Sequence, residues 1–263
     1  MITSLQNPQV QKARKLHKRS FRNEHQKFLV EGVRGVVEAL SSGATVGPVF
    51  VQEGLDGRAV EALNEAGLSS VEVFEVTRPV MGAISGTVTS PGVVALADFV
   101  DVEPAKLLSE ASGLVSVLAK VRDPGNAGTI LRTCRAAGVD ALFVAAGSVD
   151  IYNPKFVRAS AGALFAVRVA RDADASWLLT QLGKSGFQRI ATDPRGETVY
   201  HQLSLAGPTA FVFGNEAWGL ADNVAGLVDK RTRIPMAGLT ESLNVSIAAA
   251  VVLFEAARQR EMV

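Results

Sequence analysis

The residues best able to do chemistry in this sequence lie in three short polar stretches between apolar ones. The first is segment 122–133 (RDPGNAGTILRT), where Asn126 stands in a glycine-containing loop before an expected helix over 127–137. A capping role at Asn126 and a tight turn would explain the loop without any function. They do not explain Arg132, which lies outside the expected buried face of this helix. Since a helix start also favours an anion such as phosphate, we predict a functional Arg132 near this site.

The second and third polar stretches each follow an expected strand. Segment 213–216 (FGNE) closes a strand over 209–214, and segment 235–246 (PMAGLTESLNVS) joins a strand over 232–236 to a helix over 242–260. Alone, each has a structural interpretation: Gly-Asn-Glu is typical of a turn, and Thr240, Ser242 or Asn244 could simply cap the helix. Strand ends facing helix starts are nevertheless where open α/β sheets bind ligands.

Several other classes of site are disfavoured. Gly125 and Gly128 do not supply the G-x-G-x-x-G spacing of a dinucleotide-binding loop, and segment 183–185 (GKS) lacks the leading glycine of a P-loop because position 178 is leucine. Cys134 is the only cysteine, so no intrachain disulfide and no cysteine cluster for zinc can form. No metal site is predicted.

The elements that must position these residues alternate between strand and helix. The four strands expected before residue 100 are 28–32, 47–52, 71–76 and 92–99. The six expected after residue 112 are 114–121, 141–145, 164–169, 188–192, 209–214 and 232–236. The alternation indicates α/β units, the second with a mostly parallel sheet covered on both faces. A polar stretch over 100–112 separates them, and we place the domains at 1–104 and 105–263. The helix over 242–260 is apolar on every side from Ile247 to Phe254, which predicts a buried helix.

Charge and targeting signals add two expectations. Net charge is +1, but residues 1–40 carry eight Lys and Arg against three Glu. Lys12, Lys15 and Arg19 fall at helical spacing, so this face either contacts RNA or is simply solvated. The N-terminus lacks the apolar core of a signal peptide, and the longest apolar run is far below the ~20 residues of a membrane helix. We expect a cytoplasmic protein with no membrane partner.

Three motifs follow one another in the chain: N-x-G-x-x-x-R-T, F-G-N-E-x-x-G-L and I-P-M-x-G-x-x-E-S-L-N-V-S. Together and in this order they closely resemble the SpoU/TrmH branch of the SPOUT superfamily. The resemblance covers residues 114–260, and segment 153–162 (NPKFVRASAG) also looks like a family segment. The N-terminal unit resembles, less closely, a small ribosomal-protein-like RNA-binding domain.

The resemblance implies a fold and a reaction that spacing alone could not. The fold would be an α/β SPOUT domain whose C-terminal segment forms a deep trefoil knot, preceded by a small α/β RNA-binding domain. The reaction would be transfer of a methyl group from S-adenosylmethionine to a ribose 2′-hydroxyl of RNA, carried out by a homodimer packed through the knot regions.

The resemblance also implies roles for individual residues. The catalytic residues would be Arg132, Asn126, Glu216, Ser242 and Asn244. The methyl donor would be bound by Thr192, Phe213, Gly214, Asn215, Ile234, Met236, Ser242, Leu243 and Asn244. RNA would be bound by Lys12, Lys15, Arg19, Arg22, Lys155 and Arg158. Because a guanidinium holds its proton with a pKa above about 12, Arg132 would stabilise an alkoxide more readily than act as a base.

Alternative functions stay open at this point. Ribosomal RNA is favoured over transfer RNA as substrate because of the separate N-terminal domain. A role in antibiotic resistance, which some family members have, is an alternative to a housekeeping role. A non-catalytic RNA-binding or ribosome-assembly protein on the same fold is a second possibility. A nucleotide-dependent oxidoreductase is a third, which the missing glycine pattern opposes.

Overall fold

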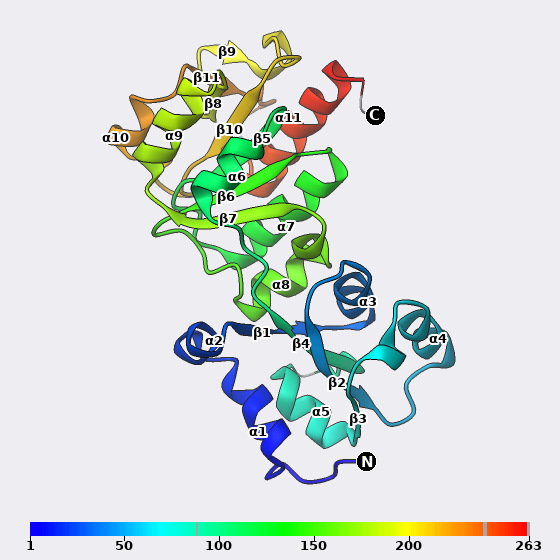
Figure 1. Ribbon diagram of the computed structural model, residues 1–263. Coiled ribbons are helices and arrows are strands. Elements are labelled where there is room, and N and C mark those ends of the chain that lie inside the picture. Colours follow the sequence, from blue (N-terminus) through cyan, green and yellow to red (C-terminus); the bar gives the residue numbers. More distant parts are fainter. Residues whose placement is uncertain (88, 239–240, 262–263) are drawn as a thin grey trace. The chain divides into compact units, whose positions relative to one another are not determined.

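The computed structural model describes residues 1–87, 89–238 and 241–261 (Figure 1). The chain forms two compact units. The first consists of Met1–Val100 with Tyr152–Ala166, and the second of Asp101–Ile151 with Val167–Val263. The segment Tyr152–Ala166 thus packs with the N-terminal unit although it lies far along the sequence.

The first unit is built on a four-stranded mixed sheet. In sheet order the strands are β1 (Lys27–Glu31), β4 (Val93–Asp98), β2 (Val46–Gln52) and β3 (Val73–Val76). β4 pairs antiparallel with both neighbours, and β2 pairs parallel with β3. The accompanying helices are α1 (Pro8–Lys15), α2 (Arg19–His25), α3 (Val33–Ser41), α4 (Gly57–Glu65), α5 (Arg78–Ser85) and α8 (Pro154–Ser160), with 3-10 turns η1 (Leu68–Ser70) and η2 (Ala163–Phe165).

Helix α1 shows why the basic opening sequence is ordered. Asn7 caps it by accepting a hydrogen bond from the Gln9 N–H, and Pro8 takes the first helical position, which proline favours. Val10 and Ala13 fall on one face and are buried, in one core cluster with residues of α5 and the sheet. Apolar burial on one side leaves the lysines on the other side in solvent.

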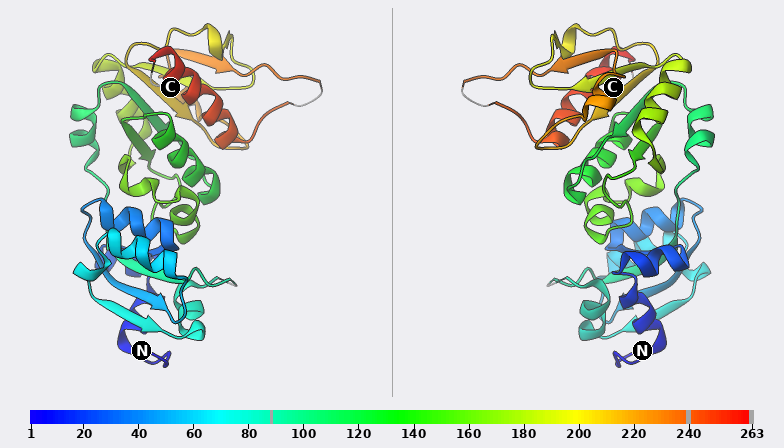
Figure 2. Two further views of the ribbon diagram at one scale, coloured as in Figure 1. Left: turned by 90° about the vertical axis from the view of Figure 1, so that its right-hand side faces the viewer. Right: turned by 90° about the vertical axis from the view of Figure 1, so that its left-hand side faces the viewer.

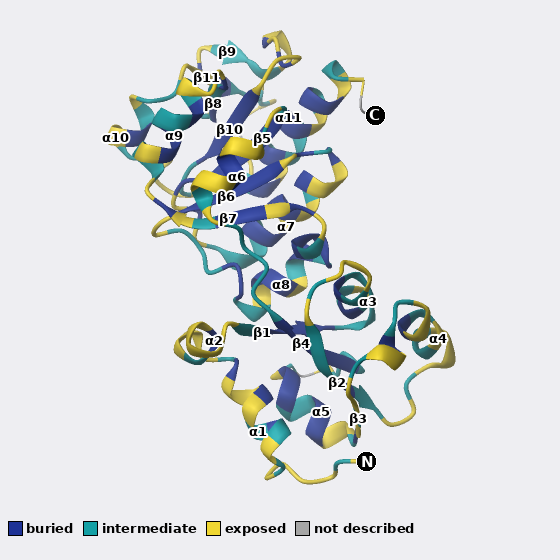
Figure 3. Cartoon of the chain, viewed as in Figure 1, coloured by how far each residue is buried: buried dark blue, intermediate teal, exposed yellow. Residues whose placement is uncertain are grey.

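The second unit is built on a seven-stranded sheet in which every described pairing is parallel. In sheet order the strands are β7 (Arg168–Ala173), β6 (Ala141–Ala145), β5 (Leu114–Leu118), β10 (Thr209–Phe213), β8 (Gln188–Thr192), β11 (Lys230–Arg233) and β9 (Thr198–Val199). Every residue of β5, β6 and β10 is buried, as expected for central strands covered on both faces (Figure 3). The predicted mostly parallel α/β sheet is confirmed.

Helices cover both faces of this sheet (Figure 2). The helices are α6 (Pro104–Glu110), α7 (Pro124–Ala136), α9 (Ala175–Lys184), α10 (Asp222–Ala225) and α11 (Val245–Gln259), with a 3-10 turn η3 (Tyr200–Gln202). Apolar residues of α6, α9 and α10 share one core cluster with the sheet. Helices α7 and α11 pack against each other, and the Cys134 thiol of α7 reaches the buried Ser116 hydroxyl of β5 at 3.4 Å.

Two helix starts differ from the sequence-based prediction. α7 begins at Pro124 rather than at 127, because Asp123 caps it by accepting a hydrogen bond from the Asn126 N–H at 2.8 Å. Asn126 is therefore not the cap, and its side chain is available for other contacts. α11 begins at Val245 instead of 242, because Asn244 caps it. Of the other two suggested caps, Ser242 lies two residues before the N-cap, and Thr240 lies outside the described residues.

Two further predictions were wrong. The strand expected over 164–169 is the 3-10 turn η2 followed by β7. Its apolar start belongs to the core of the first unit, where the rings of Phe165 and Phe28 stack with centroids 6.0 Å apart. The all-round burial expected for α11 is also wrong within one chain, since Ile247 is 51% exposed and Phe254 is 42% exposed.

Candidate functional site

A cavity of 730 Å³ lies where strands β8, β10 and β11 end in the second unit. Its walls are Asn126 together with residues drawn from segments 191–195, 214–225, 231–236 and 241–248. In a parallel sheet all carboxyl ends meet at one edge, so loops distant in sequence converge here. The volume lies within the range of sites for small organic molecules.

Polar side chains from the three sequence motifs meet at one wall of this cavity. The Glu216 carboxylate accepts hydrogen bonds from the Asn126 side-chain amide at 3.2 Å and from the Asp123 backbone N–H at 3.2 Å. The Asn126 side-chain oxygen in turn accepts from the Asn244 amide at 2.9 Å. Asn244 also caps α11 through the Ser246 N–H at 2.8 Å. One chain of hydrogen bonds therefore fixes α7, the loop after β10 and the start of α11 together.

The electrostatics of this network favour an ionised Glu216. Burial by itself raises the pKa of the Glu216 carboxyl, but hydrogen bonds from backbone N–H groups and from Asn126 outweigh it, and the pKa lies below its ordinary value. The carboxylate is thus a fixed negative charge at neutral pH.

The loop after β10 is closed by a very tight approach of backbone to backbone. A Cβ atom at Gly214 would lie 2.6 Å from the carbonyl carbon of Gly219, so only glycine fits there. Asn215 and Gly219 exchange two backbone hydrogen bonds of 2.9 Å, and the Asn215 side-chain amide donates to the Lys120 carbonyl at 3.1 Å. The motif glycines and asparagine therefore shape the cavity rim.

The structure brings together most of the residues predicted to bind the methyl donor. Those that line the cavity are Thr192, Gly214, Asn215, Ile234, Met236, Ser242, Leu243 and Asn244. Phe213 is completely buried in β10, beneath the loop that forms the rim. Sequence reasoning did not single out Trp218, Asp193 or Arg195, which also line the cavity. Trp218 was within reach of that reasoning, because it stands inside the F-G-N-E-x-x-G-L motif.

Arg132 is placed differently from the other predicted catalytic residues. It is exposed on α7, two turns after Asn126, and is not among the residues that line the cavity of its own chain. Its side chain makes no hydrogen bond or ion pair with any residue in the described part of the chain. Its guanidinium is thus presented outward, available to a group that does not belong to the same chain.

The residues predicted to bind RNA fall into two groups. Lys12, Lys15, Arg19 and Lys155 are exposed in the first unit. Arg22, by contrast, is only 3% exposed, and its guanidinium donates to the carbonyls of Leu16 at 2.8 Å and His17 at 2.9 Å. In this structure Arg22 holds the turn between α1 and α2.

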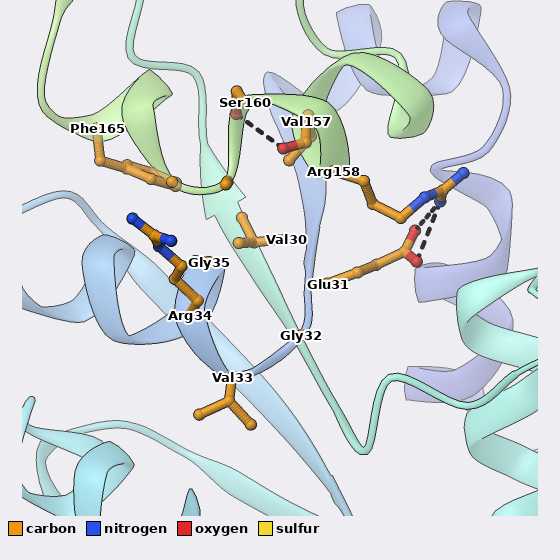
Figure 4. A pocket seen from close by; sticks show the side chains of 12 residues that line it. Val30, Glu31, Gly32, Val33, Arg34, Gly35, Val157, Arg158, Ser160 and Phe165 are labelled. Carbon is orange, nitrogen blue, oxygen red and sulfur yellow. Dashed lines mark hydrogen bonds and ion pairs between the residues drawn. The ribbon is translucent and has the colours of Figure 1, made fainter. Parts of the chain in front are cut away.

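Arg158 lines a second, smaller cavity of 240 Å³ in the first unit (Figure 4). Its guanidinium donates to both oxygens of Glu31, at 3.0 and 3.1 Å. Burial raises the pKa of the Glu31 carboxyl, and the charge of Arg158 acts in the opposite direction. A buried carboxylate needs such a partner, so Arg158 joins α8 to β1 in addition to any contact with RNA.

Two kinds of feature are missing from the described ranges 1–87, 89–238 and 241–261. No group of three or more His, Cys, Asp or Glu residues there could hold a metal ion. Nor is any helix in those ranges both long and apolar enough to cross a membrane.

A parallel α/β sheet with a small-molecule cavity at its strand ends, closed by the three motif segments, is the arrangement that the resemblance to SPOUT methyltransferases implied. Comparison with known proteins agrees. Residues 113–254 match the SpoU rRNA methylase family, and residues 7–95 match the MRM3-like substrate binding domain. The chain therefore belongs to the SpoU rRNA methylase family.

Individual relatives extend the similarity over the whole chain. An uncharacterized tRNA/rRNA methyltransferase of Synechocystis is 33% identical, over 98% of this chain and 94% of its own length. The 23S rRNA (guanosine(2553)-2′-O)-methyltransferase RlmP of Bacillus subtilis is 29% identical, over 96% and 97%. The S-adenosylmethionine-bound rRNA methyltransferase structure from Sinorhizobium meliloti superposes with a TM-score of 0.86 at 30% identity, covering 98% of this chain and 97% of that one.

These findings confirm the predicted family, activity and methyl donor. The chain is an RNA 2′-O-ribose methyltransferase that uses S-adenosylmethionine. The alternatives of an oxidoreductase and of a non-catalytic RNA-binding protein are set aside.

Proposed function

We propose that this protein methylates a ribose 2′-hydroxyl in ribosomal RNA, with residues 1–104 binding the RNA and residues 105–263 carrying out the transfer. The observation that carries the proposal is the hydrogen-bonded chain from Glu216 through Asn126 to Asn244 at the wall of the 730 Å³ cavity. Each of the three motifs contributes one member of this chain. The relative RlmP of Bacillus subtilis, named as a 23S rRNA methyltransferase, supports ribosomal RNA as the substrate.

The cavity suits S-adenosylmethionine by size and by the chemistry of its walls. Gly214 and Ile234 line the cavity, and we expect backbone N–H and carbonyl groups of their loops to bind the adenosine. The apolar side chains of Leu243 and Met236 lie among the polar groups, as is usual in small-molecule sites. When bound, S-adenosylmethionine supplies an activated methyl group on a sulfonium. The protein therefore needs to provide alignment and to manage one proton.

The proposed role of Arg132 is to stabilise negative charge that develops on the ribose oxygen. A guanidinium keeps its proton with a pKa above about 12, so Arg132 is a poor general base. It is well suited to hold a developing alkoxide and an adjacent phosphate by charge-assisted hydrogen bonds. The phosphate can then share the proton that leaves the hydroxyl. Asn126, Glu216, Ser242 and Asn244 hold the surrounding loops and the ribose in register.

A homodimer would complete this active site. Arg132 does not line the cavity of its own chain, and the neighbouring helix α11 exposes the apolar side chains of Ile247 and Phe254. These two residues are seven apart and share one helix face. In the dimer that we propose, this face packs against a second copy. Arg132 of one subunit then acts at the cavity of the other.

The first unit would gather the RNA. Lys12, Lys15 and Arg19 are exposed on α1 and α2, and Lys155 is exposed on α8. Such contacts neutralise phosphates and follow backbone shape, and sequence preference comes from unstacked bases. The match of residues 7–95 to a substrate binding domain supports this role.

The deep trefoil knot is likewise part of the proposal. Strand β11 lies beyond β10 and β8 in the sheet, and the chain then returns to α11, which packs on α7. If the C-terminal segment is threaded through a loop, as in the family, the threading would bring the cavity loops together at these strand ends. The threading would hold Ile234 and Asn244 against the loop after β10.

The test is a methyl-transfer assay on RNA that has never been modified. Ribosomal RNA and transfer RNA transcripts are incubated separately with the protein and S-adenosylmethionine labelled in its methyl group, then hydrolysed with alkali. A 2′-O-methyl group blocks cleavage of the next phosphodiester bond. We expect the label in alkali-resistant dinucleotides from ribosomal RNA. Label in transfer RNA instead would refute the substrate, and label released in mononucleotides would refute ribose as the acceptor.

A further inference from the structure

We propose that Trp218 stacks on a base of the substrate RNA next to the ribose that is methylated, an inference that rests on the function proposed above. Trp218 stands in the loop between the motif residue Glu216 and the motif glycine Gly219. The residue is 79% exposed and is among those that line the 730 Å³ cavity.

The exposure of this side chain is unusual for its chemistry. Indole is large and apolar, and tryptophan is highly buried on average. Trp218 is also the only aromatic residue among the cavity-lining residues that the structure describes. An aromatic ring left in solvent beside a substrate cavity indicates a partner with a flat apolar face.

The loop that carries Trp218 is held in one conformation. The Asn215 side-chain oxygen accepts hydrogen bonds from the N–H groups of Ala217 at 3.0 Å and Trp218 at 3.2 Å. The paired backbone bonds between Asn215 and Gly219 close the loop on both sides of the ring. The backbone under the indole is therefore ordered before any ligand binds, which lowers the entropy lost on stacking.

The position of the Trp218 loop beside the catalytic wall indicates that the partner of the indole is an RNA base. Glu216, two residues away, belongs to the network with Asn126 that marks the catalytic wall. A ribose presented to that wall carries its base and its neighbours toward the rim. Proteins that recognise single-stranded RNA stack such unpaired bases on aromatic side chains, and every base offers a π face. Trp218 would thus hold an unstacked base while its ribose enters the site.

Two other partners for the indole are outcomes of the test. One is the adenine ring of S-adenosylmethionine, which binds in the same cavity. The other is the partner subunit, if the rim is covered in the dimer. Each predicts a different set of changes when Trp218 is replaced.

The first measurement is steady-state kinetics of Trp218→Ala and Trp218→Phe on an unmodified ribosomal RNA transcript. We expect Trp218→Ala to raise KM for RNA by about 5- to 150-fold, the usual effect of removing a stacking ring. Trp218→Phe should recover most of this loss. The dissociation constant for S-adenosylmethionine, measured by calorimetry, should not change. Trp177→Ala is the matched control, because Trp177 is 37% exposed on α9 and does not line the cavity.

The second measurement uses fluorescence. The chain has two tryptophans, so Trp177→Phe leaves Trp218 as the only reporter. We expect quenching of its emission by a single-stranded ribosomal RNA fragment and little change with S-adenosylhomocysteine alone or on dilution of the protein.

Three results would overturn the inference. They are an unchanged KM for RNA in Trp218→Ala, a weakened donor affinity in that variant, and emission that follows subunit association instead of RNA. In each case the wild-type protein could still label alkali-resistant dinucleotides, so the proposed function would stand. Failure of the wild-type protein to methylate ribosomal RNA would instead refute the function itself.

Discussion

Glu216 is the residue through which the three motif segments are joined. Its carboxylate accepts hydrogen bonds from the backbone N–H groups of Arg122 and Asp123 and from the Asn126 side chain. These donors all lie at the start of α7, where the helix dipole also favours negative charge. A glutamine at this position would place its side-chain N–H groups against these N–H donors, and no hydrogen bond can form between two donors.

Replacement of Glu216 by glutamine should therefore reduce methyl transfer by about ten-fold or more, since bonds to a charged acceptor are stronger than neutral ones. The pKa of Glu216 lies below its ordinary value of 4.5, so the ionised form is favoured by the folded state. Its contribution to stability is present above about pH 4.5 and is lost as the pH falls through the lower folded-state pKa.

The measurement is the difference in unfolding free energy between wild type and Glu216→Gln as the pH is lowered from 7. We expect a constant difference down to about pH 5 and a shrinking one below. Glu197→Gln, at an exposed glutamate of the same unit, is the control and should show neither effect. A difference that grows toward low pH would contradict this role.

The residues that line the cavity were predictable from sequence where the motif was long, but their hydrogen-bond partners were not. Asn126 was expected at the site, but its neighbours Asp123 and Pro124 begin the helix, and this frees its amide for Glu216 and Asn244. Arg22 looked like the other basic residues of segment 1–40 but is buried. A charge pattern does not reveal which guanidinium meets backbone carbonyls.

At the scale of the elements, helix α11 has the apolar sequence of a buried helix, but within one chain part of its surface is exposed. Val252 and Leu253 are completely buried, while Ile247 and Phe254 are half exposed. Sequence alone predicted burial on every side because hydrophobicity does not show whether the covering surface belongs to the same chain. The proposed homodimer supplies that surface.

Replacing Ile247 by glutamate should therefore convert the protein to a monomer, because it places a charge in an apolar interface. Sedimentation velocity gives the mass, and the same sample is assayed for methyl transfer. We expect transfer to fall together with dimerisation, since Arg132 then has no partner cavity to reach. Val73→Glu, at an exposed apolar residue of the first unit, is the control. A monomeric wild type, or a dimeric Ile247→Glu with full activity, would contradict the dimer.

Strand and helix order was predictable at this scale because buried runs and turn residues are local signals. Three short elements, α6, α10 and β9, were not predicted, and the start of β7 was misplaced because Leu164 and Phe165 look like the start of a strand but pack in the first unit. A short stretch of sequence shows which residues are hydrophobic, but not which of the two units' cores they join.

At the scale of the whole molecule, two compact units divide the work that we propose: one offers exposed lysines and the other a cavity. The predicted alternation of strands and helices implied a parallel sheet, and the structure has one. Three features depend on residues far apart in the sequence. They are the strand order, the convergence of segments 191–195 and 241–248 at one cavity, and any threading of the chain. Only resemblance to a family could suggest them from sequence.

The measurement that tests the central claim most directly compares two properties of Arg132→Ala: methyl transfer to ribosomal RNA and binding of S-adenosylmethionine by calorimetry. We predict that transfer falls by about 100-fold or more, as when a preorganised charge-stabilising donor is removed, while donor affinity stays at the wild-type value. Arg135→Ala, three residues further along α7, should keep both. An equal loss of transfer and donor binding in Arg132→Ala, or full transfer without this guanidinium, would contradict the account.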